Sequence, residues 1–334
     1  MKHILSFSFL SAVIVIIIAG SNNVQAQVTE EWVQRYNGPG DGWDDAADMK
    51  VDAAGNVYVT GWSRGATSDD YCTIKYDSAG VQLWAARYNG TLDGIDDSYA
   101  LDIDGLGNVY VTGQSDAVYT SSDFLTIKYS SSGDTLWTRR WGGPGLVADQ
   151  AIDIVVDGLG NVYVTGTSNG KIATVKYDSS GVLKWSVVTT TFGAGKTIVY
   201  DPVGGGVIVA GYSGSPIDMT TIKYNSAGVQ IWFSTYNGTG DSFDEVNDLK
   251  VDPSGNVYVT GYSQTGLYVE TEDYTTLKYN SAGVQQWVAT YDGPGSDVDI
   301  AKSIAVDTSR HVHITDESIS TIYSSSDDYA AIKC

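Results

Sequence analysis

Short runs of alternating apolar and polar residues fill most of the 334-residue chain, and turn residues separate them. The first complete set spans Ala47–Asp52, Asn56–Ser63, Asp70–Tyr76 and Val81–Tyr88, which we label strands a, b, c and d. The runs are rich in Val, Ile, Thr, Tyr and Trp, and no segment of useful length has the 3.6-residue period of a helix. The pattern therefore predicts an all-β protein.

These four runs repeat along the chain. The heptad GNVYVTG of strand b occurs four times unchanged, GGVIVAG and RHVHITD are degenerate copies, and the copies begin at residues 55, 107, 160, 205, 255 and 310. The segments DYCTIKY of strand c and SAGVQLW before strand d recur with them. Four-stranded antiparallel units of about 50 residues predict a β-propeller, with GNVYVTG as a structural strand. We expect the last Gly of each heptad to release the chain into a variable loop.

The ends of the repeat array predict how the propeller closes. The last repeat stops at Cys334, directly after its c strand, and Thr29–Gly38 has the pattern of a d strand with no a, b or c strand before it. Trp32 in that segment aligns with the Trp of the other d strands. We therefore expect the N-terminal strand to complete the C-terminal blade and to close a ring of six four-stranded antiparallel blades.

The motifs GNVYVTG, DYxTIKY and SAGVQxW resemble the SBBP-type β-propeller repeats of exported bacterial proteins, and the likeness covers essentially all of the chain after residue 26. The order of the strands is also similar, more weakly, to NHL-type propellers. The resemblance implies a propeller fold and an extracytoplasmic location, but no activity. The SBBP family is regarded as seven-bladed, whereas this sequence contains six repeats.

A leader precedes the repeats. A basic start is followed by the apolar run Ile4–Ala19 and by a polar stretch ending at Ala26, which is the order of a secretory signal peptide. We expect cleavage before Gln27, so that residues 1–26 are the signal peptide and residues 27–334 form a single secreted propeller domain. An uncleaved membrane anchor is disfavoured, because the apolar run is shorter than the roughly 20 residues that span a bilayer.

The composition is strongly acidic. The chain has 40 Asp and Glu against 19 Lys and Arg, for a net charge of −21. Loss of the leader would also remove one of these lysines. Such a surface repels nucleic acid and anionic lipid, and it suits a soluble exported monomer or a protein that binds cations. The two cysteines, Cys72 and Cys334, allow at most one disulfide.

Function is expected at one end of the blades. Successive strands alternate in direction, so the d–a and b–c loops share one end, and the a–b and c–d turns share the other. The turns are nearly constant in length, whereas the b–c loops vary and contain Tyr119, Tyr268 and Tyr323. Variable loops on a rigid scaffold usually carry binding. We expect this loop end to bind an extracellular or cell-surface protein, a glycan or a cation.

An aspartate recurs at the entry to strand a in five repeats, namely Asp44, Asp96, Asp149, Asp244 and Asp299, and Gly193 stands there in the fourth repeat. A ring of carboxylates near the channel could coordinate Ca²⁺, which takes oxygen ligands in loose geometry. The alternative is that each Asp caps its own loop by accepting backbone N–H groups. Capping is favoured, because a scaffold requirement recurs in every blade and a single ligand does not.

Three further patterns allow a ligand but favour structural roles. His311 and His313 share one face of the last b strand, yet they replace the Asn and Tyr of the heptad, which favours drift over a metal site. The segment Asp102–Asn108 echoes a calcium loop but lacks its final Glu and flanking helices. A lysine in every c strand should pair with a carboxylate or extend past an aromatic ring. These lysines are Lys75, Lys128, Lys176, Lys223, Lys278 and Lys333.

The favoured function is a non-catalytic binding or scaffold module. The alternative is a hydrolase or lyase that uses channel carboxylates, with Ca²⁺ as its cofactor, since adjacent acids such as Asp44 and Asp45 could act as acid and base. An active site should break the symmetry of the repeats, and no acid in this set differs from its counterparts. We therefore expect no catalysis.

Overall fold

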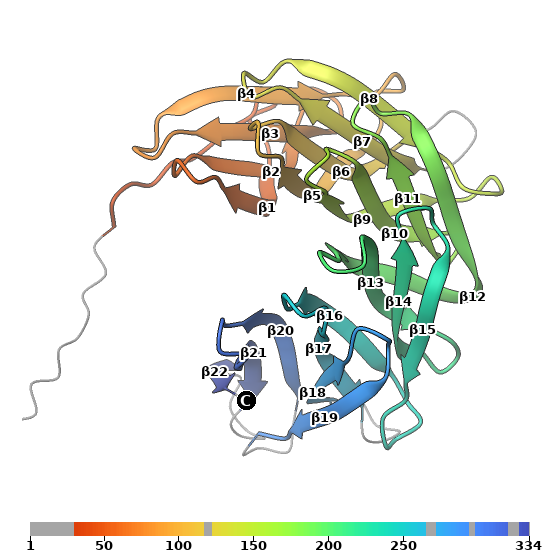
Figure 1. Cartoon of the computed structure of the whole chain (residues 1–334). Helices are drawn as coiled ribbons and strands as arrows, with labels where there is room; N and C mark the ends of the chain where they lie inside the picture. The colour runs from red at the N-terminus through yellow and green to blue at the C-terminus, as the bar shows by residue number, and fades with distance from the viewer. Residues whose placement is uncertain (1–29, 117–121, 265–271, 294–297, 320–326, 334) are drawn as a thin grey trace, which may run out of the picture. The chain divides into compact units, whose positions relative to one another are not determined.

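The structure, a computed structural model, describes residues 30–116, 122–264, 272–293, 298–319 and 327–333 (Figure 1). Every strand lies in the compact unit that begins at Gln34, and the described part of the preceding unit, residues 30–33, contains none. The described residues form 22 strands and no helix, so none of them builds a helix that could cross a bilayer. The predicted signal peptide lies outside the described residues.

The strands, labelled in Figure 1, form five antiparallel sheets. The first sheet contains β1 (Asp44–Val51), β2 (Val57–Arg64), β3 (Asp69–Tyr76) and β4 (Gln82–Tyr88), and the second contains β5 (Asp96–Ile103), β6 (Val109–Ser115), β7 (Asp123–Tyr129) and β8 (Thr135–Trp141). The third contains β9 (Asp149–Val156), β10 (Val162–Ser168), β11 (Lys171–Tyr177), β12 (Leu183–Tyr200), β13 (Gly206–Ser213), β14 (Asp218–Asn225) and β15 (Gln230–Tyr236). The fourth contains β16 (Asp244–Val251), β17 (Val257–Gln264), β18 (Glu272–Tyr279) and β19 (Gln285–Tyr291), and the fifth contains β20 (Asp299–Val306), β21 (Val312–Ile319) and β22 (Asp327–Lys333).

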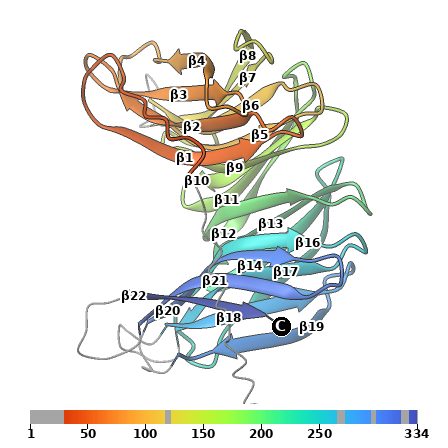
Figure 2. The same ribbon diagram turned by 90° about the vertical axis from the view of Figure 1, so that its left-hand side faces the viewer.

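Within each sheet, neighbours in sequence are neighbours in space, as the a, b, c, d pattern predicts (Figure 2). The third sheet departs from this plan, because β12 serves both as the outer strand of the third repeat and as the inner strand of the fourth. The connection between these repeats is the shortest of the chain, and it lacks the aspartate that begins the other inner strands. The strand therefore runs on without a loop.

The invariant turns are stabilised by an aspartate. The Asp52 carboxylate accepts the backbone N–H groups of Ala54 and Asn56, each at 2.9 Å, and Gly55 closes the turn with a φ of 81°. A left-handed φ favours glycine. The Asn56 side chain also donates to Asp52, at 2.8 Å. The opening residues of GNVYVTG thus recur between repeats because the turn requires them.

The last glycine of the heptad has a different role from the predicted one. Gly61 lies inside β2, where it pairs with Ala46, and does not begin a loop. A Cβ atom on Gly61 would lie 1.9 Å from the carbonyl oxygen of Asp45. The inner strand approaches this closely at a bulge between Ala46 and Asp48. Glycine is therefore needed for the close approach of two backbones.

Each sheet packs onto the next through its outer strand. Trp84 and Tyr88 of β4 pack against the buried cluster that contains Leu101 and Ile127 of the second sheet. Leu101 is only 1% exposed, whereas its counterpart Met49 on β1, in the sheet that begins the series, is 59% exposed. Burial of the inner strands therefore depends on the preceding repeat.

Inner strands of successive repeats are also joined by carboxylates. Asp48 accepts backbone N–H groups from Met49 in its own strand and from Leu101 in β5, at 2.7 and 2.9 Å. Asp153 does the same for Ile154 and for Ile198 of β12, at 2.8 Å each. These aspartates bridge neighbouring inner strands, a role that the sequence pattern did not predict.

The predicted closure of the ring is wrong for the described part of the chain. The sheet of β20–β22 has three strands, and residues 30–43 contain no strand. Tyr36 packs instead against Cys72, Ile74 and Tyr76 of the first sheet, as Tyr88 packs on the second. The side-chain pattern thus predicted a segment that packs on a neighbouring sheet. It did not predict edge pairing between the two ends of the chain, because such pairing must close a far longer loop and costs more conformational entropy.

Candidate functional site

The five predicted aspartates each begin an inner strand, and each carboxylate accepts the backbone N–H of the glycine six residues earlier. The pairs are Gly38–Asp44 (3.0 Å), Gly90–Asp96 (2.6 Å), Gly143–Asp149 (2.6 Å), Gly238–Asp244 (2.8 Å) and Gly293–Asp299 (2.6 Å). Burial raises the pKa of Asp96 and of Asp244, against the opposing effect of these bonds and of nearby serines. Each carboxylate thus has a local structural bond.

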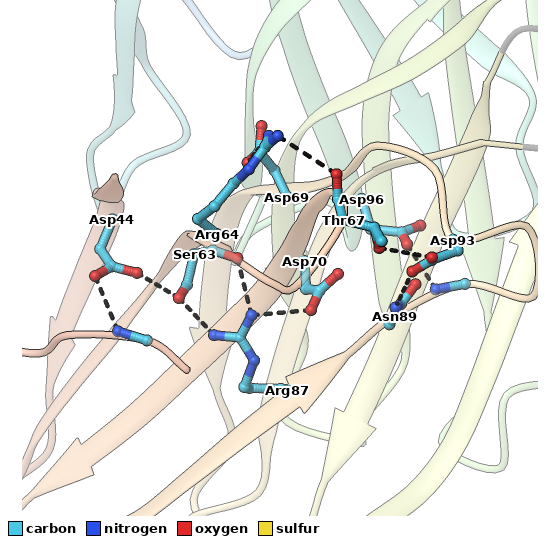
Figure 3. A network of polar contacts seen from close by, with 12 residues as sticks. Asp44, Ser63, Arg64, Thr67, Asp69, Asp70, Arg87, Asn89, Asp93 and Asp96 are labelled. Carbon is cyan, nitrogen blue, oxygen red and sulfur yellow. Dashed lines mark hydrogen bonds and ion pairs between the residues drawn. The ribbon is translucent and has the colours of Figure 1, made fainter. Parts of the chain in front are cut away.

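A polar network connects these carboxylates to the adjacent strands (Figure 3). The Ser63 hydroxyl donates to Asp44, and Arg87 on β4 donates to Ser63 and to Asp70, the latter at 2.9 Å. In the second repeat, Arg140 has the equivalent place. In each of the first two repeats, the guanidinium group of this arginine offsets the negative charge of the neighbouring aspartate, Asp70 or Asp123.

The five aspartates do not form one carboxylate group in the part of the chain that the structure describes. The one group there with three potential metal ligands within 4.8 Å of one another contains Asp273, Asp292 and Asp299. Only Asp299 of the predicted set belongs to it. The other two members were not predicted, although Asp292 departs from the Asn that follows Tyr88 and Tyr236 in other repeats.

The loops between strands d and a contact those between strands b and c. Thr67 donates to the Asp93 carboxylate at 2.6 Å, and Asp116 donates its N–H to the carbonyl of Ile95 at 3.0 Å. The two sets of loops therefore lie at the same end of the sheets, which we call the loop end. The predicted loop tyrosines, Tyr119, Tyr268 and Tyr323, lie outside the described residues.

Exposed aromatic side chains stand at the loop end: two lie directly before β1 and β16, and one lies within β12, directly before the part that serves as the inner strand of the fourth repeat. Trp43 is 83% exposed, Phe192 59% and Phe243 52%. Their backbones are fixed, because the carbonyl of Trp43 accepts the N–H of Arg64 at 3.0 Å and that of Phe243 accepts the N–H of Gln264 at 2.8 Å. Sequence reasoning missed these residues, and the recurrence of an apolar residue before the entry aspartate was the available signal.

The recurrent lysines have the predicted structural role. The ammonium groups lie over the tyrosine ring of the heptad, 4.8 to 5.0 Å from its centroid, in four repeats. The pairs are Lys75–Tyr58, Lys128–Tyr110, Lys176–Tyr163 and Lys278–Tyr258. Such cation–π contacts stabilise partly desolvated cations, so these lysines offer no sign of a ligand site.

The histidines of the last repeat share one carboxylate oxygen of Asp307. His311 Nδ1 lies 2.9 Å from it and His313 Nε2 lies 3.3 Å from it. Asn56 and Tyr58 contact Asp52 in the same way in the first repeat. Backbone and side-chain hydrogen bonds from His311 hold the pKa of Asp307 far below its usual value. The histidines thus keep the contacts of the residues that they replace.

Two other candidates also have structural surroundings. In the segment that echoes a calcium loop, the Asp104 carboxylate accepts hydrogen bonds from Leu106, Asn108 and Tyr110. Burial alone would raise the pKa of Asp104, but these bonds lower it. Cys72 is a buried free cysteine, and Cys334 lies outside the described residues.

Comparison with known proteins agrees with this architecture. The family model of the SBBP beta-propeller repeat matches residues 136–172, from β8 to the first residues of β11. Residues 136–172 of this chain are thus an SBBP-type β-propeller repeat. A curated relative, an uncharacterized WD repeat-containing protein of Acanthamoeba polyphaga mimivirus, is 30% identical over an alignment of 131 residues that covers 34% of this chain and 9% of the relative. The chain thus matches a small part of that protein.

Solved structures resemble this chain at the level of the fold. A protein from Lactobacillus plantarum has a TM-score of 0.54 at 13% identity, covering 86% of this chain and 84% of its own. The Dos1 propeller has a TM-score of 0.52 at 11% identity, covering 81% and 66%. Hydrazine synthase of Kuenenia stuttgartiensis has a TM-score of 0.57 at 12% identity, covering 82% and 76%. At these identities the likeness concerns the fold alone.

Proposed function

We propose that this chain is an exported, non-catalytic propeller of six repeats that binds an extracellular or cell-surface protein or glycan through its loop end. The observation that carries the proposal is the exposure of Trp43, Phe192 and Phe243 on backbone that hydrogen bonds hold in place. Because the backbone is already ordered, binding through these side chains costs little backbone entropy, and aromatic residues contribute strongly to binding energies at interfaces.

The contrast between the two ends of the sheets supports this location. At the turn end, Asp52 and its counterparts Asp104, Asp157 and Asp252 accept the same backbone hydrogen bond, and the turns are nearly constant in length. At the loop end, the length and composition of the b–c loops differ from repeat to repeat. Variation on a constant scaffold is typical of binding surfaces.

The local bonds of the acids argue for a binding role over catalysis. Asp44 accepts hydrogen bonds from Gly38 and Ser63, and Asp96 accepts equivalent bonds from Gly90 and Ser115. A catalytic acid or base should have surroundings that set it apart from its counterparts. These carboxylates instead share one structural arrangement.

A binding screen tests the proposal. The purified chain would be applied to a glycan array and to a panel of cell-surface proteins, together with the variant Trp43→Ala/Phe192→Ala/Phe243→Ala. Leu106→Ala/Leu159→Ala is the matched control, because both leucines are 82% exposed in turns of the opposite end. We expect the loop-end variant to lose the binding that the control retains. Equal binding by both variants would exclude the loop end as the interface.

A further inference from the structure

A pocket of about 330 Å³ lies where the third repeat meets the fourth, around the long strand β12. The third repeat contributes Ile172 and residues 187–191 to its lining, and the fourth repeat contributes Ser213, Tyr224, Gln230 and Phe233. Apolar side chains and hydroxyl groups share this lining, and none of the described residues that line the pocket is charged. Ligand pockets have volumes of about 300–1,000 Å³. The pocket is therefore large enough for a small uncharged molecule.

Other repeats place an aromatic ring at the equivalent junction. Tyr88 of β4 lies opposite Tyr71, with ring centroids 6.0 Å apart, and it packs against the second sheet. Trp141 and Phe124 form the same pair in the second repeat, with centroids 5.0 Å apart. Both outer rings lie four residues after the tryptophan of their strand, a position that Thr189 has in β12. The third repeat therefore has no ring at this place, and the pocket lies beside the threonine.

A second large side chain is also missing beside the pocket. In the first repeat, Arg87 donates to the hydroxyl groups of Ser63 and Tyr36. Strand pairing places Thr235 of the fourth repeat where the first has Arg87, and it places Ser213 where the first has Ser63. The guanidinium group that contacts this serine in the first repeat therefore has no counterpart in the fourth.

We propose that the pocket binds an uncharged phenol ring, which takes the place that Tyr36, the counterpart of Thr189, has on the first sheet. Tyr36 packs there against Tyr76, and strand pairing makes Tyr224 of the pocket lining the equivalent of Tyr76. Phe233, which is 44% exposed, supplies a further apolar contact for the ring. The ligand thus restores a contact between an aromatic ring and the following repeat.

The lining also fits the hydroxyl group of a phenol. Thr189 donates its hydroxyl to the carbonyl of Thr191 at 3.2 Å, so its oxygen remains able to accept a hydrogen bond. Thr190 and Ser213 add further hydroxyl groups to the lining. A charged ligand would lose its hydration without gaining a partner of opposite charge from these residues. The chemistry of the pocket therefore favours a neutral phenol over a charged aromatic compound.

Titration of the full chain with p-cresol and with N-acetyl-tyrosinamide, followed by ligand-detected NMR, tests the site. We expect one ligand per chain with a dissociation constant of about 10⁻³ M or below, as suits so small a molecule. Binding of p-cresol alone would identify a free phenol as the ligand, and equal or tighter binding of N-acetyl-tyrosinamide would identify a tyrosine side chain. The compound 4-methylcyclohexanol has the same substituents without an aromatic ring, and it should bind about fivefold more weakly than p-cresol. Equal binding of these two compounds would contradict a site for an aromatic ring.

Two variants locate the binding. Thr189→Tyr supplies the missing ring from the chain itself, so it should abolish binding and raise the melting temperature. Thr135→Tyr is its control, because Thr135 is an exposed residue of the outer strand β8 and lies outside the pocket. Phe233→Ala should weaken binding about fivefold, through loss of a ring contact. Val288→Ala is the matched control, because strand pairing gives Val288 the same place in the fifth repeat.

The absence of binding by the parent chain, or unchanged binding by both pocket variants, would overturn the site. Either result is independent of the loop-end proposal, because Trp43, Phe192 and Phe243 do not line the pocket. A loss of loop-end binding likewise leaves the phenol titration unchanged.

Discussion

The ammonium group of Lys223 lies 2.7 Å from the carboxylate of Asp201, and both side chains are buried. In four other repeats the heptad tyrosine separates this pair, with its ring under the lysine and its hydroxyl on the aspartate, as Tyr58 shows for Lys75 and Asp52. The fourth repeat has Ile208 in place of that tyrosine. The lysine therefore binds the aspartate directly, and the loss of one repeated residue changes the interaction of two others.

Asp201→Asn should destabilise the protein more than the same change in another repeat. It would leave the charge of Lys223 buried without its partner, which costs about 3 kcal/mol. Asp52→Asn is the matched control, because Lys75 rests on the ring of Tyr58 and keeps that contact. We expect the control to cost about 1 kcal/mol, for weakened turn hydrogen bonds. Urea unfolding measures both, and equal losses would contradict the assigned pairing.

Gly166→Ala should destabilise the third repeat severely. A Cβ atom at Gly166 would lie 2.0 Å from the carbonyl oxygen of Gln150, so the inner strand would have to move. Such overpacking costs about 3 kcal/mol. Gly158 belongs to the same repeat, and a Cβ atom there would meet no other atom within 4 Å, so Gly158→Ala should change stability by less than about 0.5 kcal/mol. Thermal melts of the two variants test this. A lower melting temperature in Gly166→Ala alone supports the close backbone contact, whereas an equal loss in both variants would mean that the repeat tolerates alanine at neither glycine.

Asp153 should make folding stability depend on pH. Burial raises the pKa of this carboxyl to about 6, although hydrogen bonds from Ile198 and Ile154 oppose the rise. Between about pH 4 and pH 6 the folded chain then binds a proton that the unfolded chain has lost, so this residue's contribution to stability falls as the pH rises through that window. Asp153 is partly exposed to solvent, which reduces the change to about 1 kcal/mol.

The test compares the parent chain with Asp153→Asn by urea unfolding at pH 4, 5, 6 and 7. The variant cannot titrate at this position, so the difference in unfolding free energy between the two proteins should shift in favour of the variant as the pH rises. A difference that stays constant over this range would show that the carboxyl has an ordinary pKa.

Tyr36→Ala should destabilise the first sheet. The side chain of Tyr36 packs against Cys72, Ile74 and Tyr76, and its loss exposes that apolar surface at a cost of about 2 kcal/mol for a half-buried ring. Arg35→Ala is the control, because Arg35 is exposed. Hydrogen exchange of β3 would be faster in Tyr36→Ala alone if the contact is as described. Unchanged exchange would mean that the N-terminal segment does not cover the sheet.

Much of the fold could be predicted from the sequence, because strand order, turns and inter-sheet packing depend on local patterns that recur. Asp52, Gly55 and Trp84 follow directly from such patterns. The unpaired N-terminal segment and the role of Gly61 inside β2 depend on which backbone segments lie side by side. The alternation of apolar and polar side chains does not contain that information. The group of Asp273, Asp292 and Asp299 was missed because its members lie in three separate segments of the chain, which only the strand pairing brings together.

The location of binding is the central claim, and a hydrogen-exchange footprint tests it most directly. The exchange of backbone amides would be measured with and without the ligand that the screen identifies. We predict slower exchange in the loop-end segments 38–44, 89–96, 189–193 and 237–244. Protection confined to the turns at 104–108 and 157–161 would place the interface at the opposite end and contradict the account.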